Sequence, residues 1–253
     1  MLEQYLKERR QKQEILLMTH IVLGHPHFDT SLRLVESMVH AGVDLIELQI
    51  PFSEPMADGP VILRANQEAL AGGATVERCF ELATEVARRF DVPFLFMTYY
   101  NVLFRRTVAG FVARMQDAGL RGAIVPDLPP EEASEYVLAM REAALAPVFI
   151  YSPNTSDQRL KAIAGYGAGF VYCVARKGVT GSETAFSAEL SSYLARARAA
   201  TSLPLAVGFG VKEKQDVDFL RGKADIAVIG SETLRVLERG GVAAVGPFLS
   251  GLR

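Results

Sequence analysis

Two carboxylic acids in one part of the sequence have surroundings that suit acid–base chemistry. Glu47 interrupts the apolar run Asp44–Ile50, and the two-residue period of a strand would put Leu45, Glu47 and Gln49 on one face. A carboxylate among apolar side chains is costly unless it is paired, protonated or functional. We therefore expect Glu47 to point into the core, either as a proton-transferring residue or as a structural acid held by hydrogen bonds.

The second acid, Asp58, lies in the segment Pro51–Pro60. Prolines and a glycine restrict the path of this segment, which would hold Asp58 at a defined place near the strand of Glu47. An Asp-Gly-Pro sequence alone is ordinary turn chemistry. Because the preceding predicted strand carries another acid, we interpret Glu47 and Asp58 as an acid–base pair.

Glycines gather at three places in the second half of the chain, which are Gly178–Gly181, Gly208–Gly210 and Gly230–Ser231. Glycine lets backbone N–H groups approach an anion closely, and the first turn of a helix adds a partial positive charge. Each cluster alone would be interpreted as a turn. Because they follow three successive predicted strands, they indicate a phosphate site that includes a short helix over Ser231–Leu237.

Several other residues with chemical potential are less specific. The tyrosines at strand ends line a pocket or close the core, and the basic pair after the sixth strand binds an anion or stays solvated: Tyr99, Tyr100, Tyr172, Arg176 and Lys177. His25 and His27 form a His-x-His pair without a third ligand at suitable spacing, so we predict no metal site. His20 and His40 are expected to be structural or at the surface.

These residues must be positioned by short strands that alternate with helices. Eight apolar runs predict the strands: Leu16–Leu23, Leu45–Ile50, Phe94–Thr98, Ala123–Pro126, Val148–Ser152, Phe170–Val174, Leu205–Gly208 and Ile226–Gly230. Nearly continuous apolar runs are typical of parallel strands that are covered on both faces. Eight of them predict a closed (β/α)₈ TIM barrel, and the alternative, a Rossmann fold, lacks its Gly-x-Gly-x-x-Gly fingerprint after the first strand.

The segments between the strands predict helices and two long loops. Apolar residues at helical spacing predict helices over Thr30–Ala41, Thr75–Phe90 and Val108–Ala118, and Pro129–Glu132 should form the first turn of another. The charged N-terminus, Met1–Gln13, predicts an extra, solvated helix that covers one end of the barrel. The long loops follow the second strand (Pro51–Gly73) and the sixth (Ala175–Ser187), where a barrel builds its active site.

Length and composition restrict the class of protein. The chain has 253 residues, of which 49% are hydrophobic and 22% charged, and we expect residues 1–253 to form a single TIM-barrel domain. The net charge of −2 gives no positive excess for a nucleic-acid partner. Two cysteines make no disulfide framework, and no apolar stretch is long enough to cross a membrane. We expect a cytoplasmic protein.

Taken together, the motifs resemble those of the tryptophan synthase alpha chain family over nearly the whole chain. The matching segments are Leu23–Pro26, Asp44–Leu48, Pro51–Pro60, Tyr99–Asn101, Gly178–Gly181, Gly208–Gly210 and Gly230–Ser231. The resemblance implies a lyase of tryptophan biosynthesis that cleaves indole-3-glycerol phosphate to indole and glyceraldehyde 3-phosphate by a retro-aldol reaction. It also implies an α₂β₂ heterotetramer in which indole passes to the β subunit.

The resemblance assigns roles to residues of this chain. It implies that Glu47 and Asp58 are catalytic. It implies substrate-binding roles for one set of residues, Tyr99, Tyr172, Thr180 and Phe209, and phosphate-binding roles for a second set, Gly181, Gly210, Gly230 and Ser231. The chain itself would need no metal and no organic cofactor, and pyridoxal phosphate is expected only in the β partner.

Two residues depart from the family pattern. Gln49 stands where the family has glycine, on the same strand face as Glu47, and His25 stands where it has aspartate. Gln49 could narrow the pocket, form a hydrogen bond with Glu47 or alter the choice of substrate. Two alternatives therefore stay open: a stand-alone or altered-substrate lyase that releases indole, and a catalytically silent barrel that regulates the β subunit.

Overall fold

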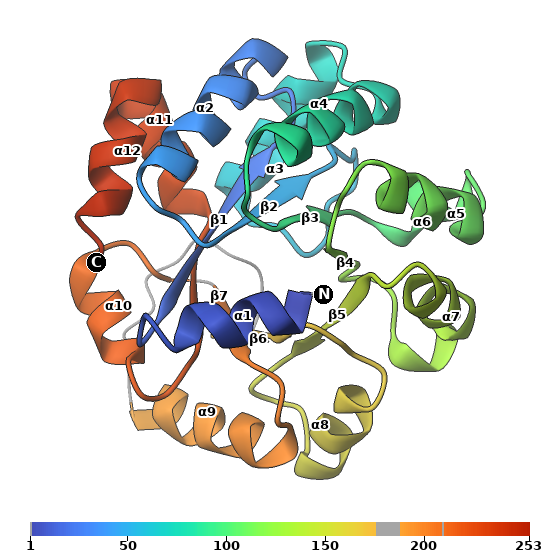
Figure 1. The fold of residues 1–253 in the computed structure, drawn as a ribbon, viewed down its shortest axis with the longest axis vertical. Coiled ribbons are helices and arrows are strands. Elements are labelled where there is room, and N and C mark those ends of the chain that lie inside the picture. Colours follow the sequence, from blue (N-terminus) through green and yellow to red (C-terminus); the bar gives the residue numbers. More distant parts are fainter. Residues whose placement is uncertain (1, 176–187, 209) are drawn as a thin grey trace.

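A closed barrel of eight parallel strands forms the centre of the computed structural model, which describes residues 2–175, 188–208 and 210–253 (Figure 1). Each strand pairs with the next, and β8 returns to pair with β1. The strands are β1 (Leu16–Val22), β2 (Leu45–Gln49), β3 (Phe94–Met97), β4 (Gly122–Ile124), β5 (Ala146–Tyr151), β6 (Val171–Val174), β7 (Leu205–Gly208) and β8 (Ile226–Ile229). All eight predicted strands and the TIM-barrel class are confirmed.

Helices surround the barrel, and one or two of them follow each strand (Figure 1). They are α1 (Leu2–Arg10), α2 (Phe28–His40), α3 (Pro60–Ala71), α4 (Val76–Arg89), α5 (Tyr100–Phe104), α6 (Val108–Asp117), α7 (Ser134–Glu142), α8 (Asp157–Ala164), α9 (Ala188–Ala200), α10 (Lys214–Leu220), α11 (Ser231–Gly240) and α12 (Val242–Ser250). Thr75 caps α4 by accepting the Arg78 N–H, and Gly42 follows α2 at a φ of +82°, a conformation that favours glycine. No helix in the described residues is long and apolar enough to cross a membrane.

The strands separate two apolar cores. Leu45 packs inside the barrel with residues such as Met18 and Leu95, whereas Ile46 and Leu48 pack outside against the helices. The two-residue period predicted for β2 is therefore confirmed. Because Glu47 and Gln49 share the parity of Leu45, both side chains lie inside the barrel and are buried.

The N-terminal helix α1 lies across one end of the barrel (Figure 1). Leu2 and Leu6 are buried among the residues that fill the barrel interior. The predicted helix and its place over one end of the barrel are confirmed, because its buried side closes the N-terminal ends of the strands while most of its charged side chains are exposed. The opposite end, where the strands finish, is left for a site.

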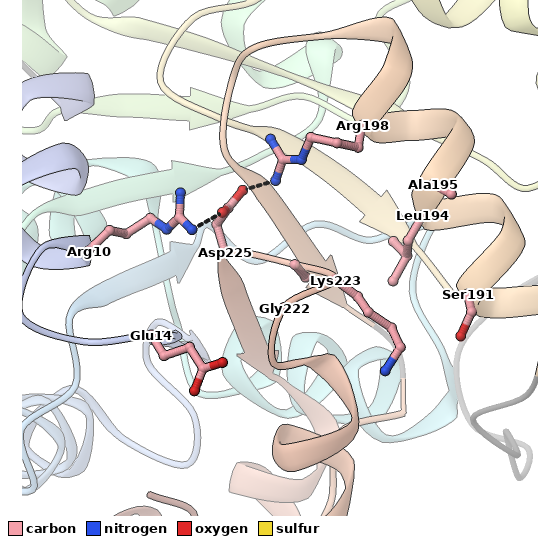
Figure 2. Close-up of a pocket in the computed structure, with 10 residues that line it drawn as sticks. Arg10, Glu14, Ser191, Leu194, Ala195, Arg198, Gly222, Lys223 and Asp225 are labelled. Atoms are coloured by element: carbon pink, nitrogen blue, oxygen red, sulfur yellow. Dashed lines mark hydrogen bonds and ion pairs between the residues drawn. The ribbon is translucent and has the colours of Figure 1, made fainter.

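Two buried aspartates anchor α1 on either side of β1. Asp44, directly before β2, accepts hydrogen bonds from Arg9 and from the Leu17 N–H. Figure 2 shows the second aspartate, Asp225 before β8, beside a surface pocket and between Arg10 and Arg198. At this end of a barrel such interactions serve stability.

The connections differ from expectation in two places. Pro130–Glu132 forms a separate 3₁₀ turn and α7 begins only at Ser134, so the prediction that Pro129–Glu132 starts the helix is wrong. Pro130 is buried, and the turn packs against the helix rather than continuing it. The long connection after β2 contains α3, and most of the predicted long loop after β6 lies outside the described residues.

Candidate active site

The centre of the candidate site is Glu47, whose carboxylate is buried inside the barrel toward the C-terminal end of β2. His20 Nδ1 lies 3.0 Å from Glu47 Oε1, and the two residues are direct partners in the register of β1 and β2. The other oxygen, Oε2, is buried and has no hydrogen-bond partner among the described residues. One oxygen of Glu47 is thus held in place and the other is available to a ligand.

His20 was missed by the sequence analysis as a site residue. Its exposed fraction is 4%, so the surface alternative is wrong for His20, whereas His40 is exposed as that alternative allowed. Burial disfavours the imidazolium, but the charge and hydrogen bond of Glu47, the charge of Asp58 and the nearby side-chain oxygen of Gln49 outweigh it, and the pKa of His20 is raised. The signal was present, because His20 shares the strand parity of Leu16 and Met18.

Asp58 lies on the loop between β2 and α3, at the end of the barrel where the strands finish. Its Oδ2 accepts hydrogen bonds from Gln49 Nε2 at 2.6 Å and from the Tyr99 hydroxyl at 3.1 Å. Burial raises the pKa of Asp58, and these two hydrogen bonds and the nearby His20 only partly offset the effect. Gln49, the departure from the family pattern, therefore donates to Asp58 and not to Glu47.

Tyr99 holds the loop that carries Asp58. The Ala57 N–H donates to the Tyr99 hydroxyl at 3.1 Å, while the Tyr99 ring stacks on Phe52 with centroids 5.0 Å apart. Asn66 of α3 accepts the Phe52 N–H at 2.9 Å, which fixes the same loop from its other side. Tyr99 itself is fully buried, and its contacts with described residues position the loop that carries Asp58.

Tyr172 reaches the site from β6 and depends on a glycine opposite. A Cβ on Gly208 would lie 2.3 Å from the Tyr172 hydroxyl oxygen, so only glycine leaves room for this ring. Burial raises the pKa of Tyr172, and the charges of Glu47 and Asp58 add to the rise. The hydroxyl therefore stays protonated beside the two acids.

Gly230 and Ser231 begin the ten-residue helix α11 directly after β8. Among the described residues, a Cβ on Gly230 would touch only His20 Cβ, at 3.9 Å, so this part of the chain leaves the position open. Gly210 adopts a φ of +127°, which favours glycine. A helix N-terminus beside an open glycine suits an anion.

Several of the residues singled out from the sequence lie outside the described part of the chain. They are Arg176, Lys177, Thr180 and Gly181, in the segment 176–187, and Phe209. Their predicted roles stay predictions.

The His-x-His pair does not join the site. His25 is buried with Nδ1 3.2 Å from Glu68 Oε2 on α3, and burial lowers the pKa of His25 despite that carboxylate. His27 is exposed. Among the described residues, no three His, Cys, Asp or Glu side chains gather as a metal site would require. That the chain works without a metal stays a prediction.

Comparison with known families gives one match over most of the chain. Residues 6–244 match the family described as "Tryptophan synthase alpha chain". The chain is 64% identical over 252 residues to the tryptophan synthase alpha chain of Desulforapulum autotrophicum, with 100% of each chain covered. It is 60% identical over 253 residues to that of Syntrophotalea carbinolica, again with 100% of each covered.

Solved structures agree in fold. A chain from Mycobacterium tuberculosis tryptophan synthase superposes with a TM-score of 0.93 at 29% identity, with 99% of this chain and 96% of that chain covered. A chain from the tryptophan synthase α₂β₂ complex of Pyrococcus furiosus gives a TM-score of 0.88 at 32% identity, with 94% and 97% covered.

Proposed function

The chain belongs to the tryptophan synthase alpha chain family, and from that premise we propose that it cleaves indole-3-glycerol phosphate to indole and glyceraldehyde 3-phosphate. The observation that carries the proposal is the pair of acids at the C-terminal end of the barrel. Glu47 and Asp58 are each held by hydrogen bonds through one oxygen, Oε1 and Oδ2. A substrate between them would meet the remaining oxygen of each acid.

Glu47 would move the proton that the reaction transfers. Breaking the bond between indole C3 and the glyceryl carbon requires a proton at C3 and removes the proton of the glyceryl hydroxyl, so the net change is one proton shifted within the substrate. Glu47 Oε2, buried and without a partner among the described residues, would give a proton to C3 and take the hydroxyl proton back. The bond between indole C3 and the glyceryl carbon breaks after the proton reaches C3 and as the hydroxyl loses its proton.

Asp58 would stabilise the charge that appears on the ring. Protonation at C3 leaves the indole positively charged, and the charge is shared with the ring nitrogen. A carboxylate that accepts the indole N–H stabilises this state more than the neutral substrate. Both hydrogen bonds to Asp58 within the described residues end on Oδ2, and Oδ1 would therefore be the acceptor.

The phosphate would lie at the start of α11. Backbone N–H groups of the first turn, at Gly230 and Ser231, have no partners within the helix, and the helix dipole favours an anion there. The neighbouring Gly210, together with Gly181, would complete the site. Tyr172, with Thr180 and Phe209, would line the part that receives the indole ring.

A β subunit is the proposed partner, in an α₂β₂ heterotetramer. The structural neighbours include chains from tryptophan synthase complexes. Two large apolar side chains at the active-site end are exposed, Met56 on the loop after β2 by 72% and Phe104 at the end of α5 by 67%. Exposed apolar side chains near a site mark contact surfaces. Indole would pass through this surface to pyridoxal phosphate in the β subunit, while this chain holds no cofactor. Two buried free cysteines fit a reducing cytoplasm.

The test is steady-state release of indole from indole-3-glycerol phosphate, with and without a β subunit. Activity that depends on β supports the proposed α subunit. Full activity of the isolated chain would instead make it a stand-alone lyase. No indole in either assay would contradict the proposed reaction, and unchanged stimulation of β by an inactive chain would identify a silent regulator. Activity only on another aryl glycerol phosphate would identify an altered-substrate lyase.

A further inference from the structure

A line of buried polar side chains joins the two acids of the site. At one end His20 Nδ1 lies 3.0 Å from Glu47 Oε1, and at the other Gln49 Nε2 donates to Asp58 Oδ2 at 2.6 Å. The exposed fractions of His20, Glu47 and Gln49 are 4%, 3% and 0%. Inside the barrel, His20 is thus bound to one acid and Gln49 to the other.

The two facing atoms in the middle of this line are His20 Nε2 and Gln49 Oε1. Both are buried, and neither forms a hydrogen bond with any of the described residues. His20 pairs with Glu47 in the strand register, so Gln49 is the next inward-facing residue along β2. A proton on Nε2 would let the imidazole donate to the Gln49 carbonyl oxygen, because an imidazolium is a donor at both nitrogens.

We propose that His20 is a positioning residue for Glu47, holding Oε1 through Nδ1 so that Oε2 faces the substrate. Gln49 joins the same imidazole to Asp58, which makes one hydrogen-bonded line between the two acids. This role rests on the proposed lyase function. It gives a purpose to Gln49, which stands where the family pattern has glycine, and to a histidine that a barrel interior would otherwise bury at a cost.

The line stabilises the charges that the reaction separates. When Glu47 gives its proton from Oε2 to indole C3, Glu47 becomes a carboxylate and the ring becomes positive. The imidazolium then lies against the new negative charge, and Asp58 faces the positive ring. His20 neither gains nor loses a proton, because the hydroxyl proton of the substrate returns to Oε2.

The groups around His20 favour its charged form. Glu47 and Gln49 face it from β2, and Asp58 faces it from the following loop. On the side of β8 the nearest position is Gly230, which brings no charge because it has no side chain. Tyr172 completes the surroundings of the two acids as a protonated hydroxyl.

The first experiment follows the His20 imidazole by NMR in the intact chain, with the resonance assigned from His20→Asn. We expect the pKa of His20 to lie above its ordinary value of 6.5, as the structure indicates. Glu47→Gln should lower this pKa by about one unit or more, and Gln49→Leu by less. An imidazole that titrates at the same pH in wild type and in Glu47→Gln would overturn the proposed line, whether or not the chain cleaves the substrate.

The second experiment is kinetic and separates positioning from folding. In His20→Phe, kcat should fall roughly 10- to 100-fold while KM changes less than about threefold. His20→Asn keeps an N–H donor near the place of Nδ1 and should recover much of kcat. Wild-type kcat/KM should also fall at high pH as His20 loses its proton, and His20→Asn should lack that fall.

The outcomes of the two experiments distinguish the two proposals. A wild type that cleaves no indole-3-glycerol phosphate defeats the proposed function, and the NMR titration still decides whether the line exists. An active wild type with an equally active His20→Phe overturns the positioning role. Thermal unfolding and binding of a non-cleavable indolyl alkyl phosphate show that each variant is folded.

Discussion

Tyr99 and Asp58 are joined by a hydrogen bond of 3.1 Å between the phenol hydroxyl and Oδ2. The same hydroxyl accepts the Ala57 N–H, so it contacts the loop at two successive residues. Tyr99 follows β3 and is fully buried, whereas Asp58 belongs to the loop after β2. The position of one acid is therefore set by a rigid side chain from the neighbouring strand.

Tyr99→Phe should lower kcat/KM about 10-fold, since it removes one hydrogen bond to Asp58 and leaves the Ala57 N–H without its partner. The ring would still stack on Phe52, so the barrel should remain folded. Steady-state kinetics and thermal unfolding measure the two effects. Tyr151→Phe is the matched control, because it loses a buried hydroxyl bond to the Leu160 carbonyl away from the site. Equal activities of the two variants would refute the positioning contact.

The inward direction of Glu47 could be predicted because it depends on local pattern alone. Strand parity, applied to Leu45–Gln49, placed Glu47 and Gln49 inside the barrel, and the structure confirms this. The same parity applied to β1 would have placed His20 inside, beside Glu47. A single histidine in an apolar run is, however, also compatible with a structural or surface position, so strand parity alone does not mark His20 as a site residue.

The hydrogen bonds around Asp58 could not be predicted from the sequence. Tyr99 is 41 residues from Asp58, and their contact depends on how the loop Pro51–Gly59 closes over the ends of two strands. A one-residue change in that path would move Asp58 away from both Gln49 and Tyr99. Packing also decides the structure at Pro130–Glu132. The proline and the acids there favour a helical turn, but the buried Pro130 keeps it as a separate 3₁₀ turn, and α7 begins only at Ser134.

Glu47→Gln should reduce kcat by roughly 10³-fold while the substrate still binds, because the amide keeps the shape of the side chain but cannot give and take the proton at Oε2. Single-turnover indole release measures the chemistry, and isothermal titration with a non-cleavable indolyl alkyl phosphate measures binding. The control Glu68→Gln changes an exposed glutamate near His25. Turnover within a few-fold of wild type would remove Glu47 from the proton transfer.

Asp58→Asn should raise thermal stability at neutral pH although it removes activity. Burial raises the pKa of Asp58 above its ordinary 3.8, so the folded chain holds this proton more tightly than the unfolded chain. The contribution of the group to stability is then full below 3.8 and is lost as the pH rises through the folded pKa.

The measurable sign is a difference in melting temperature that depends on pH. The variant should melt a few degrees above wild type at pH 7 to 8, and the gap should narrow as the pH falls toward the folded pKa. Asp157→Asn, an exposed aspartate paired with Arg196, should show no such narrowing. A variant less stable than wild type at every pH would contradict the expected cost of burying this carboxylate.

Gly230→Ala should weaken the binding of phosphate without unfolding the chain. Of the residues that the structure describes, the added methyl would contact only His20 Cβ, at 3.9 Å, so the loss of stability should stay within about 1 kcal/mol. It would occupy the open position at the start of α11, and KM should rise about 10-fold. Inhibition by inorganic phosphate should weaken in parallel. Gly167→Ala, whose methyl would also have only ordinary contacts, is the control, and an equal effect on KM would count against the phosphate site.

Asp225→Asn should destabilise the barrel without changing its chemistry. Asp225 is 2% exposed, pairs with Arg10 at 2.7 Å and with Arg198, and accepts the Leu205 N–H at 2.6 Å. An amide keeps part of this bonding but loses the charge, which should cost about 2–3 kcal/mol. The two arginines remain partly solvated, so no charge is left buried, and the loss stays below that of a fully buried pair.

The melting temperature should therefore fall by roughly 5–10 °C, while kcat and KM at 25 °C stay unchanged. The reason for the separation is geometric. Asp225 precedes β8 at the N-terminal end of the barrel (Figure 2), whereas Glu47 and Asp58 lie toward the C-terminal ends of the strands. Glu77→Gln removes an exposed ion pair with Arg106 and should change the melting temperature by no more than about 2 °C. Equal losses in the two variants would mean that burial adds nothing to the Asp225 interactions, and that α1 is held by Asp44 and by the buried Leu2 and Leu6.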